Sequence, residues 1–517
     1  MQARDSKTAG PQGLDLGGIW YRGAGVCIMR TRWIWLLVSV GGLAVFFEGC
    51  GESPGLSASF DYVVPARFAV PDLRHSDEQG EYEVYADGPL QPDTWLVQLN
   101  ACTSTGSIVE YRWSIDDAGV GVETRCDGFE YDFPAEGEYS VSLVVEDGSG
   151  EQMEQTQVIV VRDLLIFGLG DSYGSGEGSP DVNDFDEGGV QWQNTRCHRS
   201  AQSAQVRAAQ MIEEADPHTS VTFVHVACSG GRIHRALLEP YDGIEPDGTP
   251  AAPQIDRVAE IAGDDEIDAL FVSIGGNDIN FSSVVEACVL GTDCHLGNPG
   301  IDPLLESTAS WACGFTGSFE EECKSYLNPD VINADSLDAR AIFDVGSEDE
   351  YVDGVDLRQD GLDDLETNYD DLALAIVDSL GMDPARVYLT EIPDVTRDEF
   401  GDLCAWPTEL PGYLESLRIA AQQVPGVTEA EMEWASNYVL TELRAAMRVS
   451  ATKHGWQFVD GVDARFSGHG YCSDVTWLTR LQNTFQFQGD QNGALHPNRA
   501  GYGAYADAIV EAFDAAQ

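Results

Sequence analysis

The stretch that decides the fold runs Ile166-Phe167-Gly168-Leu169-Gly170-Asp171-Ser172-Tyr173-Gly174-Ser175-Gly176-Glu177-Gly178. An apolar run breaks here into a glycine-rich turn that carries the hydroxyl of Ser172. The run belongs to a series of apolar, β-rich segments: Leu164–Leu169, Val221–Ala227, Ala269–Ile274, Arg386–Ile392 and Gln457–Val459. Helical patterns lie between or after them: Ser200–Ala215, Ala252–Ala262, Tyr369–Leu380, Thr428–His454 and Arg499–Ala515. Strands that alternate with helices predict an α/β fold in which a parallel sheet is covered on both faces.

Polar or glycine-rich blocks follow the first three of these predicted strands, and a histidine comes late in the chain. The blocks are Gly170-Asp171-Ser172, then Cys228-Ser229-Gly230-Gly231, then Gly275-Gly276-Asn277-Asp278, and finally Leu495-His496-Pro497-Asn498. Parallel sheets bind ligands beyond the carboxyl ends of their strands, so these residues are expected to meet. A serine hydroxyl attacks only when a base removes its proton, and the charge that develops needs fixed donors. The set predicts a serine esterase.

The turn around Ser172 has other interpretations when it is taken alone. Such turns bind anions or serve as flexible loops, and the glycines of 168–178 loosely match a dinucleotide-binding pattern. The dinucleotide interpretation fails because no acidic ribose partner follows at the usual distance. Gly170–Gly174 also fits the G-x-S-x-G elbow of α/β-hydrolases. That elbow normally arrives several strands into its domain, whereas Ser172 follows the first strand, which argues against that fold.

Together, the four blocks in this order resemble the SGNH (GDSL) hydrolases. The likeness covers residues 163–517 and is greatest to secreted actinobacterial esterases and lipases. Further strings that carry it are Cys197-His198-Arg199-Ser200 and Phe466-Ser467-Gly468-His469-Gly470-Tyr471-Cys472-Ser473. The resemblance implies a three-layer α/β/α, flavodoxin-like parallel sheet. It also implies a carboxylic ester hydrolase that requires no cofactor and no metal.

The resemblance assigns a role to each residue. Ser172 would be the nucleophile and His496 the general base. The oxyanion hole would consist of the backbone N–H groups of Ser172 and Gly230 and the side-chain amide of Asn277. Removing one such donor typically costs roughly 3–4 kcal/mol of transition-state stabilisation. Asp171, next to the nucleophile, is expected to shape the turn rather than to transfer a proton.

The third member of the usual triad is missing. Relatives carry an aspartate three residues before the histidine, and this position is Gly493 here. The imidazole still needs an acceptor on its other nitrogen to fix its tautomer and orientation. We expect the backbone carbonyl of Gly493 to orient His496, with the carboxylate of Asp490 as the alternative. Among the other histidines, His469 is the rival base, although a loop-closing role near Cys472 suits it better, and His198 is expected to be structural.

The N-terminal part divides into a leader, a linker and a small domain. Met29-Arg30-Thr31-Arg32 and the apolar residues up to Phe47 resemble a lipoprotein signal, with the start possible at Met29 and Cys50 as the acylated residue. Residues 1–50 are therefore expected to be a leader and 51–80 a linker. Short alternating strands over 81–162 predict an all-β, immunoglobulin-like sandwich. The string from Tyr131 to Gly150 resembles a PKD-type domain.

The cysteines fit an exported protein. Apart from Cys27 and Cys50, an even number remains, as expected for a disulfide framework, and no CxxC pair suggests zinc. Cys102 and Cys126 could join within the sandwich. The family resemblance implies the pairs Cys197–Cys228, Cys288–Cys294 and Cys404–Cys472, which leaves Cys313 and Cys323 for each other. The last two lie in a lid-like insertion at about 291–361, which we expect to contain no clear strand and to set substrate choice.

Charge limits the partners. The net charge of −60, from 28 basic and 88 acidic residues, argues against nucleic acid, whose binding needs basic patches. The expected substrate is an ester, either a lipid or an acylated small molecule or glycan. A polysaccharide O-acetyl esterase is one alternative, and a non-catalytic surface adhesin is another. We expect a bacterial protein that is exported, as a cell-envelope lipoprotein or secreted, with membrane contact only through Cys50. The front domain could contact a surface glycan or protein.

Overall fold

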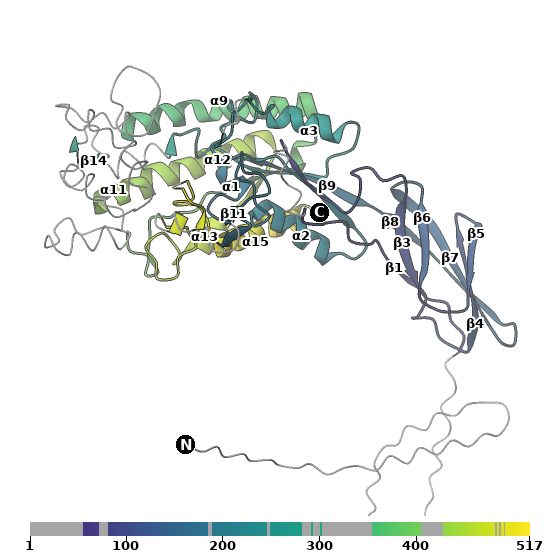
Figure 1. Ribbon diagram of the computed structural model, residues 1–517. Helices are drawn as coiled ribbons and strands as arrows, with labels where there is room; N and C mark the ends of the chain where they lie inside the picture. The colour runs from purple at the N-terminus through teal and green to yellow at the C-terminus, as the bar shows by residue number, and fades with distance from the viewer. Residues whose placement is uncertain are drawn as a thin grey trace, which may run out of the picture.

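The computed structural model describes residues 55–71, 81–184, 189–245, 249–281, 291–292, 300–301, 354–404, 428–480, 483–484, 487–490 and 492–517 (Figure 1). Side chains are described over the same ranges except at 184, 291–292, 300–301 and 354–360. The predicted leader with Cys50 lies outside the described residues. The same holds for the expected Cys288–Cys294 and Cys313–Cys323 pairs and for most of the 291–361 insertion.

The C-terminal domain is built on one large sheet. Its parallel strands are β9 (Asp163–Gly170), β12 (Ser220–His225), β13 (Ala269–Ser273), β16 (Val387–Thr390) and β17 (Gln457–Val459). They lie in the order β17-β16-β13-β9-β12, with a further strand, β2, at the β12 edge. Nearly every residue of β9, β12, β13 and β16 is buried, because helices cover both faces of the sheet. The alternation of apolar runs and helical patterns predicted these five strands correctly.

The helices divide between the two faces of the sheet (Figure 1). On one face, α2 (Ala204–Ala215) packs against α15 (Arg499–Ala516), and α15 also contacts β16 and β17. On the other face, α9 (Gly354–Leu380) contacts both α3 (Gln254–Ala262) and α12 (Thr441–His454). The connections β9–α2–β12 and β12–α3–β13 place helices on opposite faces. From β9 the chain goes first to β12 on one side and then to β13 on the other, so the strand order reverses between β9 and β13. Ligands bind at the carboxyl ends of the strands at such a point.

Three helical or inserted segments differ from their predicted form. The helix expected to begin at Tyr369 begins at Gly354, inside the expected insertion, and two short paired strands, β14 (Gly291–Thr292) and β15 (Gly300–Ile301), also lie there. The expectation of no strand in the insertion was therefore wrong. The single helix expected over Thr428–His454 is α11 (Glu429–Trp434), a π-helical segment η6 (Ala435–Leu440) and α12. Its apolar spacing runs through the π-helical segment, so the pattern gave no sign of the change.

The N-terminal domain is a two-sheet sandwich. One sheet has the order β1-β3-β6, made of Asp61–Val63, Trp95–Asn100 and Phe129–Phe133. The other has the order β5-β4-β7-β8, made of Ala118–Glu123, Ile108–Ile115, Gly137–Asp147 and Gln152–Val161. Val97, Phe133 and Leu143 are fully buried between the sheets. A disulfide joins Cys102 to Cys126 within this domain. The predicted all-β sandwich is confirmed.

The chain passes between the two domains more than once. β1 lies within the expected linker of residues 51–80, yet it pairs with β3 of the sandwich. β2 (Glu83–Tyr85) lies within the expected sandwich, yet it pairs antiparallel with β12 as an edge strand of the large sheet. Tyr85 is fully buried there. The boundaries drawn at 51–80 and 81–162 therefore differ from the structure, because strands of three residues carry too little alternation to reveal which sheet they join.

Five short elements complete the described domain. They are α1 (Ser172–Ser175), β10 (Val182–Asp184), β11 (Gly189–Gln191), η5 (Pro384–Arg386) and α13 (Val462–Phe466). Within the described ranges, no helix combines the length and the apolar composition that crossing a bilayer requires.

Candidate active site

Ser172 is held on a tight turn between β9 and the single-turn helix α1. Asp171 is the N-cap of α1, and its side chain accepts a hydrogen bond from the Tyr173 backbone N–H at 3.0 Å. Gly170 has a φ of 138°, and a Cβ at this position would collide with the Ser273 carbonyl of β13. Only glycine allows β9 and β13 to approach so closely at the turn. The serine side chain is thus fixed at the carboxyl edge of the sheet.

The structure brings Ser172 and His496 together across more than 300 residues of sequence. The Ser172 Oγ lies 2.7 Å from His496 Nε2. The imidazole Nδ1 lies 3.0 Å from the backbone carbonyl of Ala494. This geometry fixes a tautomer with the proton on Nδ1 and leaves the Nε2 lone pair facing the serine hydroxyl. The pair can therefore act as nucleophile and base.

The hydrogen bond of 3.0 Å at His496 Nδ1 is to the carbonyl next to the one expected. The Gly493 carbonyl accepts the backbone N–H of His496 at 3.2 Å and so closes a turn of four residues. The next carbonyl along the chain, at Ala494, lies 3.0 Å from Nδ1. The Asn492 and Gly493 carbonyls also interact with the imidazole and, like that of Ala494, raise the pKa of His496 against the effect of burial. The Asp490 carboxylate, the alternative acceptor, instead accepts from Gln488 and from the backbone of Asn492. The acceptor is a backbone carbonyl, as expected, but it belongs to the following residue.

Neighbouring residues support the histidine loop. Leu495 takes a φ of 65°, which a leucine adopts only under constraint. The Tyr173 hydroxyl donates to the Leu495 carbonyl at 2.9 Å, and the Tyr173 ring packs 5.1 Å from the imidazole, centroid to centroid. The Thr479 N–H donates to the His496 carbonyl at 2.7 Å. These contacts keep the ring in place beside the serine.

The expected oxyanion donors lie at the same edge of the sheet. In the strand register, Gly168 pairs with His225 and Gly170 pairs with Ser273, so the ends of β9, β12 and β13 are level. Gly230 follows β12 with a φ of 79°. Within the described part of the chain, neither the Ser172 nor the Gly230 backbone N–H has an acceptor. These two groups are available to a developing negative charge.

Asn277 stands in the loop that follows β13. Its side-chain amide donates one hydrogen to the Gly231 carbonyl at 3.0 Å. That contact joins the loop after β13 to the loop after β12. A primary amide carries two donors, and the described residues offer the second one no acceptor. Tyr369 supports the same loop, because its hydroxyl donates to the Ile274 carbonyl.

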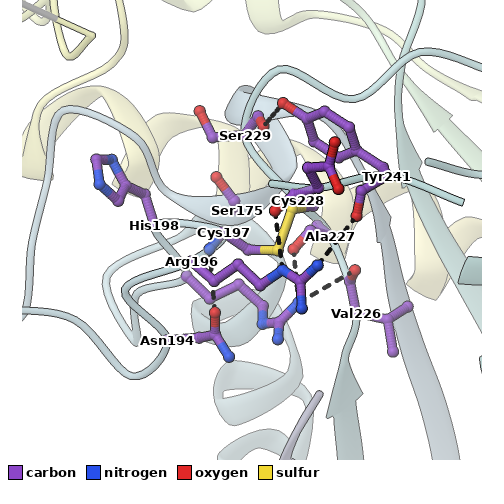
Figure 2. The surroundings of a disulfide bond; sticks show 12 residues. Ser175, Asn194, Arg196, Cys197, His198, Val226, Ala227, Cys228, Ser229 and Tyr241 are labelled. Atoms are coloured by element: carbon purple, nitrogen blue, oxygen red, sulfur yellow. Dashed lines mark hydrogen bonds between the residues drawn. A yellow bond between two sulfur atoms is a disulfide. The ribbon is translucent and has the colours of Figure 1, made fainter. Parts of the chain in front are cut away.

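The loop that carries Gly230 is fastened from several sides. A disulfide joins Cys197 to Cys228, and Figure 2 shows the Tyr241 hydroxyl donating to Ser229 beside it. The Cys228 N–H donates to the Gly170 carbonyl at 3.0 Å, which fixes this loop to the nucleophile turn. The expected Cys404–Cys472 disulfide is also present and joins the segment after β16 to the segment after α13. The geometry of the Gly230 loop is therefore set before any substrate arrives.

The two other histidines considered from the sequence lie elsewhere. His469 Nδ1 faces the Val475 carbonyl, and its ring stacks on Trp477 with centroids 3.9 Å apart. His198 is fully buried. Its Nδ1 lies 2.9 Å from Glu177 and its Nε2 lies 3.4 Å from Glu245.

Ligand atoms of His198, Glu245 and Asp490 lie within 4.8 Å of one another, as in a metal site. Burial alone would lower the pKa of His198, but the Glu177 carboxylate outweighs that effect and raises it to about 10. The carboxylates that pair with the His198 imidazolium are Glu177 and Glu245.

Sequence reasoning missed Glu177. This carboxylate is fully buried, and Glu177 lies shortly after Ser172 in the same glycine-rich stretch. A charged residue between Gly176 and Gly178, inside an otherwise small and apolar segment, is the signal that could have found it. Burial lowers the pKa of His496, and the Glu177 charge opposes that effect. The base is consequently neutral at pH 7 and able to accept a proton.

Comparisons with known proteins identify the front domain. Residues 83–160 match the PKD domain family. A solved PKD1 domain from the Vibrio cholerae metalloprotease PrtV is 20% identical over 20% of this chain and 94% of that chain, with a TM-score of 0.13. No curated protein matches the chain. The PKD match begins at β2, so its first three residues lie in the large sheet rather than in the sandwich.

Two solved carbohydrate esterases also match. One is an active-site mutant of a family two carbohydrate esterase from Clostridium thermocellum, 12% identical over 89% of this chain and 98% of that chain, with a TM-score of 0.26. The other is a carbohydrate esterase with catalytic and non-catalytic binding functions, 11% identical over 75% of this chain and 97% of that chain, with a TM-score of 0.20. Scores at this level assign neither a fold nor an activity.

Proposed function

We propose that the C-terminal domain is a serine hydrolase of carboxylic esters, of the SGNH type. The observation that carries the proposal is the contact of 2.7 Å between the Ser172 Oγ and His496 Nε2, with Nδ1 held by the Ala494 carbonyl. A nucleophile, a base and a group that orients the base are the parts that covalent acyl transfer needs. A carbonyl acceptor in place of a carboxylate makes this pair a Ser–His dyad.

The proposed reaction has two halves. Ser172 Oγ attacks the ester carbonyl carbon while its proton moves to His496 Nε2, and the carbonyl electron pair moves onto oxygen. The N–H groups of Ser172 and Gly230 and the Asn277 amide stabilise this oxyanion. The carbonyl then re-forms, the bond to the alcohol breaks, and His496 gives its proton to the leaving alcohol. Water repeats the sequence on the acyl-enzyme, with His496 as base, and releases the acid.

The reaction needs a neutral His496, so activity should fall as the imidazole becomes protonated. Burial lowers the pKa of His496 below its ordinary value of 6.5. The acid limb of the activity profile is therefore expected below pH 6.5, and the enzyme should work in mildly acidic media.

The direct test is ester hydrolysis by the full chain and two serine-site variants. Wild type should hydrolyse p-nitrophenyl esters, and Ser172→Ala and His496→Asn should each lose activity by a factor of about 1,000 or more, as triad residues do. His469→Asn is the matched control, because His469 stacks on Trp477 away from Ser172, and it should keep wild-type turnover. Undiminished hydrolysis by folded Ser172→Ala would contradict the proposal.

The acyl-chain profile separates the two kinds of esterase. Substrates from acetate to palmitate should be compared at the same pH. A preference for long chains would indicate a lipase, whereas turnover of acetate alone would indicate a polysaccharide O-acetyl esterase. A folded wild type that hydrolyses none of these esters, and none of an acetylated polysaccharide, would favour a binding role.

A further inference from the structure

Glu177 is the one fully buried carboxylate that touches all three parts of the described site, and the reaction above gives it no role. Its backbone N–H donates to the Ser172 carbonyl at 3.1 Å, within the nucleophile turn. Its carboxylate accepts the Ser229 hydroxyl at 2.5 Å, next to the oxyanion residue Gly230. It also accepts the Gln488 side-chain amide at 2.6 Å, in the segment that leads to the histidine loop.

Further bonds lock this arrangement. The Gln488 amide oxygen accepts the Gly178 N–H at 3.2 Å, so the residue after Glu177 is tied to the same side chain. A Cβ on Gly178 would lie 3.0 Å from the His496 Cβ, which means that this backbone packs directly against the base. The Tyr502 hydroxyl donates to the Glu177 carbonyl at 2.8 Å from α15. A movement of Glu177 would therefore displace the base and the Gly230 loop together.

The carboxylate is charged despite its burial. Burial would raise the pKa of Glu177, but the charge and hydrogen bond of His198, with contributions from His496 and Ser229, lower it to about 2. The titratable groups that face it are His198, His496, Asp490, Tyr241 and Tyr502. Since the tyrosines and His496 are neutral at pH 7, the local field comes from the carboxylates and the His198 imidazolium. Glu177 is the charge that raises the pKa of His496 against the effect of burial.

We propose that Glu177 is a positioning residue that replaces the missing acid of the triad in two ways. Its hydrogen bonds fix the positions of the nucleophile turn, the Gly230 loop and the histidine loop relative to one another. Its negative charge stabilises the imidazolium that His496 becomes during attack, a task that the neutral Ala494 carbonyl performs only weakly. The inference rests on the proposed function, since it assumes that His496 accepts the serine proton.

The test uses a probe that does not depend on the natural substrate. A fluorophosphonate forms a bond between phosphorus and the serine oxygen and releases fluoride, while the serine proton goes to His496. Its labelling rate, measured on the full chain across pH, reports the activation of Ser172. In Glu177→Gln, the labelling rate at pH 8 should fall at least about tenfold, and the acid limb should move to lower pH, because the imidazolium loses its stabilising charge.

Two further variants separate charge from packing. Glu177→Asp keeps the charge, so its acid limb should stay near that of wild type even where its labelling is slower. Glu245→Gln is the matched control: Glu245 contacts the other nitrogen of His198, but its side chain is 55% exposed and does not touch Glu177. It should leave both the rate and the acid limb unchanged. A purely structural Glu177 would slow labelling without moving the limb.

Each outcome decides something. If wild type neither labels nor hydrolyses esters, the proposed function is wrong and this inference fails with it. If wild type labels and folded Glu177→Gln keeps the wild-type limb, only the inference is overturned. If Glu177→Gln does not fold, Ser229→Ala decides. This variant removes the hydrogen bond that the Ser229 hydroxyl donates to the Glu177 carboxylate, so the negative charge of Glu177 acts more strongly on His496. The acid limb of the labelling profile should therefore move to higher pH. An unmoved acid limb would overturn the inference.

Discussion

At the scale of single residues, the site depends on backbone groups where many hydrolases use side chains. The Ala494 carbonyl can fix the tautomer of His496, but it carries no full charge to stabilise the protonated ring. Leu495 must take a left-handed conformation to present that carbonyl. The strain at Leu495 is held by a hydrogen bond from Tyr173, a residue adjacent to the nucleophile. The nucleophile turn thus helps to position its own base.

We predict that Tyr173→Phe lowers kcat by about tenfold with little change in KM. The change removes the hydroxyl that holds the Leu495 carbonyl at 2.9 Å but keeps the ring that packs on His496. A lost hydrogen bond of this kind is worth about 1 kcal/mol in stability, and a misplaced base adds to the loss in rate. Steady-state kinetics on a p-nitrophenyl ester would measure it. An equal rise in KM at unchanged kcat would show instead that Tyr173 binds substrate.

The residues of the site were predictable to different degrees. Ser172 and His496 stand in short motifs beside glycine and proline, whose backbone restrictions leave a strong pattern in the sequence. The choice between Gly493 and Ala494 depends on the backbone conformation of this loop, in which Leu495 takes a φ of 65°, and the sequence pattern does not reveal that conformation. Glu177 was missed because its partners, Ser229 and Gln488, approach it only in the folded sheet.

At the scale of elements, the loop after β12 is held by a disulfide and by several hydrogen bonds. The Cys197–Cys228 disulfide closes a loop with a sequence separation of 31. Arg199, which is 1% exposed, donates to the carbonyls of Val226 and Ala227 from the same side. In the proposed reaction this loop presents a backbone N–H to the oxyanion, and these bonds would let it do so without reorganising.

We predict that the double variant Cys197→Ser, Cys228→Ser is less stable by roughly 2–4 kcal/mol, the usual contribution of a disulfide of this kind. Its kcat should also fall at temperatures where the variant remains fully folded, because the disulfide no longer fixes the position of the Gly230 loop. Denaturant unfolding and ester kinetics should be measured together. The matched control is Cys102→Ser, Cys126→Ser, which removes the sandwich disulfide and should leave kcat intact.

The sequence predicted the strands correctly where every residue of the strand is buried. The strands of the large sheet are continuous apolar runs because helices cover both faces. The π-helical segment between α11 and α12 did not follow, because its sequence keeps the helical spacing. The added residue per turn is accommodated by tertiary packing and by Thr441, whose hydroxyl donates to the Ser436 carbonyl at 2.8 Å.

At the scale of the whole molecule, the PKD-type sandwich and the α/β domain are interlocked. The segment after β1 runs along the α/β domain, where the Val64 N–H donates to the Pro217 carbonyl and Arg67 pairs with Asp163 at 3.1 Å. β2 then adds Glu83, which pairs with the buried Arg199. The segment between β1 and β3 of the sandwich therefore reaches Arg199, which bonds the loop after β12, through Glu83.

We predict that Glu83→Ala destabilises the α/β domain by roughly 3–5 kcal/mol, because it leaves the guanidinium of Arg199 buried without its carboxylate. Thermal inactivation of ester hydrolysis would measure the loss. Glu110→Ala is the control: it removes an ion pair with Arg112 whose side chains are 36% and 38% exposed, and the loss there should stay below about 1 kcal/mol. Equal effects of the two variants would mean that the buried Glu83–Arg199 pair contributes no more to stability than the exposed pair.

The place of β2 also sets an order of events while the chain is made. Glu83–Tyr85 is synthesised long before Ser220–His225, the strand on which it must lie. Chains are made from the N-terminus at about 5–20 residues per second, so this strand waits without a partner for several seconds. The sandwich can form early, but the segment that carries β2, between β1 and β3, stays unpaired until β12 has been synthesised. A strand pairing near the start of the described chain therefore forms only after all the strands of the sandwich have been made.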